Sequence, residues 1–89
     1  MVKVHDRVTK RHPELSVAGI RRAWDNRVAM ALRETSEQDF YIAIGFDDRG
    51  RELEMVSVVE DDGTILIFHA MTPPSKKTLF ELGIRGGSR

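Results

Sequence analysis

Residues 40–70, FYIAIGFDDRGRELEMVSVVEDDGTILIFHA, decide the fold because they predict three β-strands joined by two tight turns. Apolar, aromatic and β-branched residues alternate with the two-residue period of a strand over 40–46, 52–60 and 64–70. The sequences DDRG and DDG between these segments are typical of turns. Two hairpins in succession indicate an antiparallel meander.

The segments that precede this meander favour two helices and one further strand. Val4 and Val8 stand four residues apart and Pro13 opposes helix continuation, so we predict a first helix over about 3–11. Ser16 is a favourable N-cap, and the apolar stripe that follows it predicts a second helix over about 17–26. Residues 28–35 are suited to an edge strand.

The order of the predicted elements defines the fold class. Pro73, Pro74 and Ser75 predict entry into a helix over about 75–82, which Gly83 ends. The order ααββββα predicts an α+β fold, with two N-terminal helices packed on a four-stranded antiparallel meander and a short C-terminal helix. Because the helices are separated from the strands in the sequence, we expect all the helices to pack on one face of the sheet. Because 89 residues are too few for two hydrophobic cores, we predict one domain over 1–84 and a flexible tail over 85–89.

Composition restricts the compartment and the partners. Apolar residues make up 40% of the chain and charged residues 31%, which is the balance of a globular protein. The chain has no cysteine, no apolar leader at residues 1–6 and no membrane-length apolar run, so we expect a cytoplasmic protein without a membrane partner. Fourteen basic residues balance fourteen acidic ones, so any contact with nucleic acid must depend on local patches.

Few residues in the sequence are candidates for catalysis or ligand binding. The chain lacks a phosphate loop, an HExxH motif and a GxSxG motif, and His5 and His12 are spaced too far apart for one metal ion, so we predict no metal site. His69 lies near the exit of the last predicted strand, on the same face as Ile65 and Ile67 by strict alternation. It is either a half-buried histidine with a backbone partner or a group that transfers a proton or contacts a phosphate.

Two basic groups have similar alternatives. Arg7, Lys10 and Arg11 form one face of the first predicted helix, which His12 extends; this face either follows a nucleic-acid backbone or is simply solvated. Lys76 and Lys77 open the last predicted helix and either help to hold an anion there or form a solvated helix start. We expect four aromatic residues to lie in the core: Trp24, Phe40, Phe46 and Phe68.

Three stretches of the chain resemble the BrnT family of bacterial toxins. They are TKRHPELSVAGIRRAWDN at 9–26, YIAIGFDDRGRELEMVSVVEDDGTILIFHA at 41–70, and the basic segment after the last strand. The resemblance implies a RelE-like fold and the activity of a small ribonuclease of a type II toxin–antitoxin system. By position it implies roles for His12, His69, Lys76 and Lys77. Met71 and Thr72 stand where the family has consecutive arginines.

The resemblance leads to an expected function and one alternative. We expect a metal-independent endoribonuclease toxin that cleaves mRNA without a cofactor and is neutralised by a cognate antitoxin. Its catalytic residues would be His69, Lys76 and Lys77, and its RNA-binding residues Arg7, Lys10, Arg11 and His12. The alternative is a catalytically silent, BrnT-like module that binds a protein. Residues 29–32 are a candidate edge for strand addition by an antitoxin, and a homodimer is a further expectation.

Overall fold

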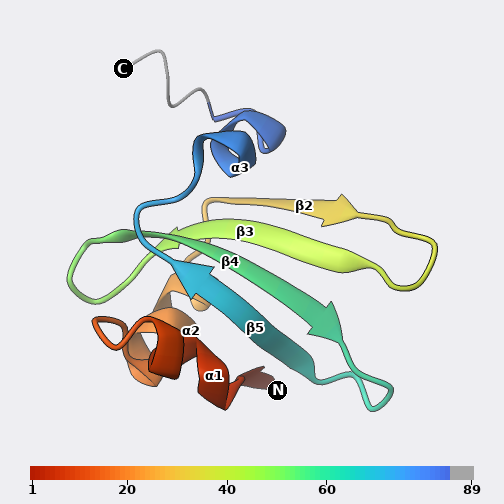
Figure 1. Cartoon of the computed structure of the whole chain (residues 1–89), viewed down its shortest axis with the longest axis horizontal. Coiled ribbons are helices and arrows are strands. Elements are labelled where there is room, and N and C mark those ends of the chain that lie inside the picture. The colour runs from red at the N-terminus through yellow and green to blue at the C-terminus, as the bar shows by residue number, and fades with distance from the viewer. Residues whose placement is uncertain (85–89) are drawn as a thin grey trace.

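A five-stranded mixed sheet is the centre of the fold in this computed structural model, which describes residues 1–84 (Figure 1). The elements are β1 (Val2–Val4), α1 (Asp6–Arg11), α2 (Val17–Asp25), β2 (Ala29–Arg33), β3 (Phe40–Phe46), β4 (Glu52–Val59), β5 (Ile65–Met71) and α3 (Lys76–Glu81). The strand order is β1-β5-β4-β3-β2. The tail predicted at 85–89 lies outside the described residues. Within residues 1–84, each helix is too short or too polar to cross a membrane.

The general α+β class is confirmed, but the predicted arrangement is wrong at the N-terminus. Strands β2 to β5 form an antiparallel meander, whereas β1 adds a fifth strand that runs parallel to β5. Val2 and Val4 are partly buried, alternate with exposed Lys3, and pair with the first half of β5. This pairing satisfies backbone groups that β5 would otherwise leave free at its edge. The first helix therefore begins at Asp6 and follows a strand.

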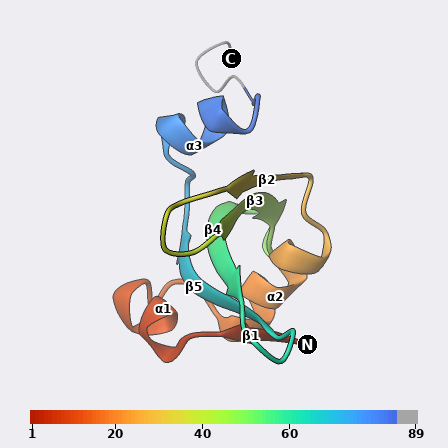
Figure 2. The same cartoon turned by 90° about the vertical axis from the view of Figure 1, so that its right-hand side faces the viewer.

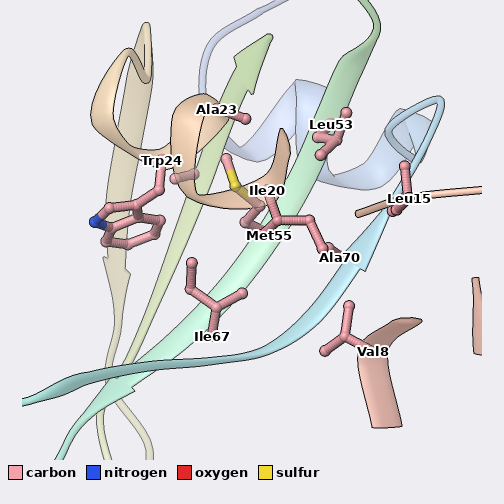
Figure 3. Packing of buried hydrophobic residues seen from close by; sticks show 10 residues of the cluster. Val8, Leu15, Ile20, Ala23, Trp24, Leu53, Met55, Ile67 and Ala70 are labelled. Carbon is pink, nitrogen blue, oxygen red and sulfur yellow. The ribbon is translucent and has the colours of Figure 1, made fainter. Parts of the chain in front are cut away.

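The main hydrophobic core lies between α2 and one face of the sheet. Ser16 accepts a hydrogen bond from the backbone N–H of Gly19 at 3.0 Å, which confirms the predicted start of this helix. Helix α2 packs against β1, β3 and β4, and its apolar stripe belongs to the same core cluster as Ile67 of β5. Its core residues Ile20, Ala23 and Trp24 are buried together with Leu53, Met55 and Ile67 (Figure 3).

Helix α2 approaches β3 closely at Gly45. A Cβ atom built at this glycine would lie 2.0 Å from the carbonyl oxygen of Ala23. No side chain fits at that distance, so the missing Cβ allows the helix and the strand to pack together.

Helix α3 lies across the sheet from α2, so the prediction that all helices pack on one face is wrong (Figures 1 and 2). Alternation in β4 places Glu54 on the face opposite Leu53 and Met55. The backbone N–H of Ser75, the N-cap of α3, donates to Glu54 at 3.0 Å. Ile44, which pairs directly with Glu54, is fully buried on this face.

The prediction of a core location is confirmed for Trp24 and wrong for the phenylalanines. Trp24 is 3% exposed, but Phe46 is 44% exposed and Phe40 and Phe68 are only partly buried. Phe40 and Phe46 lie on the face of β3 that points away from α2. The second helical layer, α3, is too short to cover that whole face.

A β-bulge changes the face on which His69 lies. Ser57 pairs with Ile67, whereas the preceding residue, Val56, pairs with His69, so Phe68 is an extra residue in β5. The bulge moves His69 to the face opposite Ile67, where Glu54 lies. The predicted shared face of His69 with Ile65 and Ile67 is therefore wrong, because strict alternation does not hold across the bulge.

Replacing Gly45 with alanine is expected to destabilise the protein by about 3 kcal/mol, because the new methyl group forces α2 and β3 apart. Urea denaturation of both proteins measures the change. Gly50→Ala is the matched control: Gly50 has a φ of 76° but open space around its Cβ position, so only about 1 kcal/mol is expected. Equal losses for the two variants would contradict the close approach at Gly45.

Candidate active site

A cleft of about 450 Å³ opens on the face of the sheet that points away from α2. Arg7 and Arg11 of α1 line one part of it, and Arg33 of β2 lines another. Glu54 of β4 and His69 of β5 complete the set of polar lining residues. The remaining lining residues are Phe40, Val56 and Phe68.

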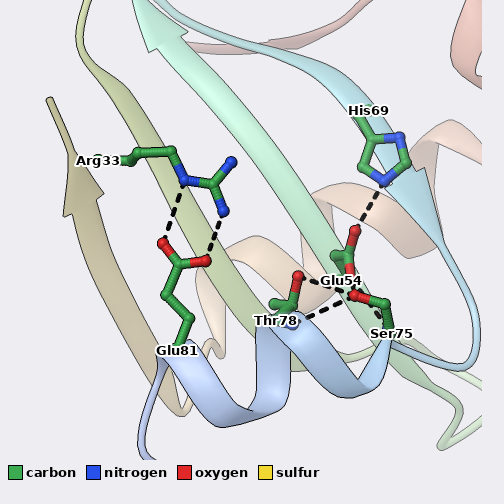
Figure 4. A network of polar contacts seen from close by, with 6 residues as sticks. All are labelled: Arg33, Glu54, His69, Ser75, Thr78 and Glu81. Carbon is green, nitrogen blue, oxygen red and sulfur yellow. Dashed lines mark hydrogen bonds and ion pairs between the residues drawn. The ribbon is translucent and has the colours of Figure 1, made fainter. Parts of the chain in front are cut away.

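Glu54 and His69 form a hydrogen-bonded pair in this cleft. His69 Nε2 lies 2.9 Å from Glu54 Oε2 (Figure 4). The other carboxylate oxygen, Oε1, accepts hydrogen bonds from the backbone N–H and the hydroxyl of Ser75, at 3.0 and 2.9 Å. Glu54 is only 7% exposed, so these contacts replace most of its solvent.

The contacts of Glu54 keep its carboxylate ionised. The hydrogen bond with His69 is the main reason that the pKa of Glu54 is lowered from 4.5 to about 2. Burial acts in the opposite direction, and the hydrogen bonds from Ser75 and Thr78 lower the pKa further. A fixed negative charge therefore faces the His69 ring at neutral pH.

The ionised carboxylate determines the orientation of the His69 ring. A carboxylate only accepts hydrogen bonds, so Nε2 carries the proton that lies between the two groups. The other ring nitrogen, Nδ1, points away from Glu54 (Figure 4). The side chain of His69 is 35% exposed, so Nδ1 is placed to exchange a proton with a bound molecule.

The three arginines differ in their partners. Arg33 forms a two-pronged ion pair with Glu81, which ties β2 to α3 (Figure 4). Arg7 and Arg11 are exposed, and within residues 1–84 neither forms an ion pair. Their four-residue spacing puts both guanidinium groups on one side of α1. They supply positive charge to the cleft, and no carboxylate of residues 1–84 forms an ion pair with them.

The structure brings together three of the seven residues that the sequence suggested. His69, Arg7 and Arg11 line the cleft, whereas Lys10, His12, Lys76 and Lys77 do not. His12 Nδ1 instead lies 3.4 Å from Glu14 Oε2. At the start of α3, the backbone N–H of Ser75 donates to Glu54, and the backbone N–H of Thr78 donates to the hydroxyl of Ser75.

Sequence reasoning missed Glu54 and Arg33. Each is a charged residue in a strand whose side chains alternate between the two faces of the sheet. Such a position by itself indicates an ordinary solvated residue. Their partners lie far away in the sequence: Ser75 is the N-cap of α3, and Glu81 is the last residue of that helix. Among residues 1–84, no three His, Asp or Glu side chains are grouped so that they could hold a metal ion.

Comparison with known proteins found no relative of this chain. The chain matches no protein-family model, no curated protein and no solved structure.

Glu54→Gln is expected to lower the stability of the protein at pH 6 by up to about 3 kcal/mol, because the folded state holds the pKa of Glu54 at about 2. A lowered pKa stabilises the fold above pH 4.5, and this contribution disappears as the pH falls toward 2. The difference between wild type and variant in urea denaturation should therefore shrink between pH 5 and pH 2.5. Glu37→Gln, in an exposed loop, is the control. If the difference in stability between wild type and Glu54→Gln did not depend on pH, this would contradict an ionised Glu54 carboxylate in the folded protein.

Proposed function

We propose that this protein is an endoribonuclease that cleaves RNA with its own side chains and without a metal ion. The observation that carries the proposal is the His69–Glu54 pair, which lies in one cleft with the unneutralised guanidinium groups of Arg7 and Arg11. Cleavage of RNA by its own 2′-hydroxyl needs a proton acceptor and positive charge close to the phosphate. These residues supply both.

Each residue has one role in this reaction. His69 Nδ1 takes the proton of the ribose 2′-hydroxyl, whose oxygen forms a bond to the adjacent phosphorus. The bond from phosphorus to the 5′-oxygen of the next nucleotide breaks, and that oxygen takes a proton from solvent, leaving a 2′,3′-cyclic phosphate and a 5′-hydroxyl. Arg7 and Arg11 stabilise the extra negative charge that develops on the phosphate. Glu54 positions the ring through its contact with Nε2.

The biological setting that we propose is that of a toxin. The resemblance of residues 9–26 and 41–70 to BrnT toxins supports mRNA as the substrate, a cognate antitoxin as the partner and the cytoplasm as the location. Because the net charge of the chain is zero, binding of RNA must depend on a local basic patch, and Arg7 and Arg11 supply one in the cleft.

A protein-binding module without catalysis is the second candidate. It is supported by β2, which is an edge strand of the sheet with the apolar side chains of Met30 and Leu32 45% and 47% exposed. A free edge of this kind accepts an added strand from a partner. An antitoxin bound there would also be consistent with the toxin proposal.

Cleavage of a fluorescent single-stranded RNA in EDTA tests the proposed reaction. His69→Gln is expected to reduce the rate by about 10²- to 10⁴-fold, because it removes the proton acceptor. Arg7→Gln and Arg11→Gln should each slow cleavage, whereas Lys10→Gln, on the same helix but outside the cleft, should cleave near the wild-type rate. Wild-type cleavage by the His69→Gln protein would refute the proposed site.

Controlled expression in a bacterial host tests the biological setting. We expect growth arrest and fragmentation of cellular RNA with the wild-type chain, and neither effect with His69→Gln. Normal growth and intact RNA at high expression would favour the protein-binding module.

A further inference from the structure

A second hollow of about 250 Å³ adjoins the cleft along the same face of the sheet. Arg7, Phe40 and Phe68 line both spaces, so the two lie next to each other. The second hollow contains neither His69 nor Glu54. The second hollow therefore holds no group that transfers a proton in the proposed reaction. It shares with the cleft Arg7, the residue proposed to hold a phosphate.

An aromatic pair stands at the junction of the two spaces. The ring centroids of Phe40 and Phe68 are 5.7 Å apart, and the rings are inclined by 58°. Both side chains are partly exposed on the face opposite the main core. Aromatic rings that remain accessible beside a positively charged groove are the usual platform on which proteins stack the bases of a single strand.

The rest of the hollow suits the flat, apolar face and the polar edge of a nucleobase. Val58 and Leu66, which pair directly across β4 and β5, supply apolar surface. His5 and Gln38 add polar groups. His5 Nδ1 accepts the backbone N–H of Arg7 at 3.1 Å, so its Nε2 is the ring nitrogen that carries a proton. The amide of Gln38 offers a donor and an acceptor.

We infer that this hollow, the base pocket, binds an unpaired nucleobase next to the phosphate held by Arg7, with the base stacked on Phe40 and Phe68. The inference depends on the proposed ribonuclease function and specifies its substrate as single-stranded RNA. A base in a duplex keeps its faces stacked on its neighbours, so it cannot enter. The adjacent positions of base pocket and cleft match the alternation of base and phosphate along one strand.

Binding of oligonucleotides that cannot be cleaved tests the base pocket. A fluorescein-labelled, 2′-O-methyl single strand lacks the nucleophile, and its Kd is measured by fluorescence anisotropy at low salt. Phe40→Leu and Phe68→Leu, which keep an apolar side chain but remove the ring, are each expected to raise the Kd about tenfold. Phe46→Leu is the matched control, since Phe46 lies on the same face of β3 but lines neither space. Urea denaturation of each variant reports whether it is folded.

A second oligonucleotide tests the pocket without any variant. An abasic strand with the same sugar–phosphate chain should bind the wild-type protein about tenfold more weakly, and Phe40→Leu should weaken it no further. Equal affinity of the wild type for the two strands would overturn the base pocket. If Arg7→Gln still weakened binding in that case, the ribonuclease proposal would stand. Failure of the wild type to bind either strand would overturn both proposals.

Discussion

A buried carboxylate on the central strand is the constraint on which much of this structure depends. Glu54 is almost removed from solvent, and an ionised group in such a place costs several kcal/mol unless polar partners surround it. Its partners come from two further elements, His69 of β5 and Ser75 at the start of α3. The hydrogen bonds to the Glu54 carboxylate therefore orient the ring of His69 and also hold the start of α3 against the sheet.

The two faces of the sheet differ in what covers them. One face is closed by α2, with Gly45 allowing the helix to approach and with Ile20, Met55 and Ile67 in the core. The opposite face is covered by α3 near β2 and is otherwise open at the cleft. Strands held rigidly from behind position side chains on the open face more precisely than loops would. The core thus supports the geometry that the proposed chemistry requires.

Local patterns explain which parts of the fold could be predicted. The strands at 40–46, 52–59 and 65–71 and the helix capped by Ser16 depend on alternation, turns and caps, all of which are read from neighbouring residues. β1 is only three residues long, and it pairs with residues 65–67 of β5, which lie far away in the sequence. For the site, Arg7, Arg11 and His69 are recognisable by residue type, whereas Glu54 and Arg33 acquire significance only through partners in α3. Non-local contacts of this kind leave no periodic signal in the sequence.

The bulge at Phe68 allows one strand to contribute side chains to two different environments. Ahead of the bulge, Ile67 packs into the core; beyond it, His69 faces solvent in the cleft, although both belong to one strand. One additional residue is enough to convert the second half of a strand from one environment to the other, while the turns and the neighbouring pairs keep their places. The sheet therefore places a polar side chain in the cleft and an apolar side chain in the core from the same strand, without a loop between them.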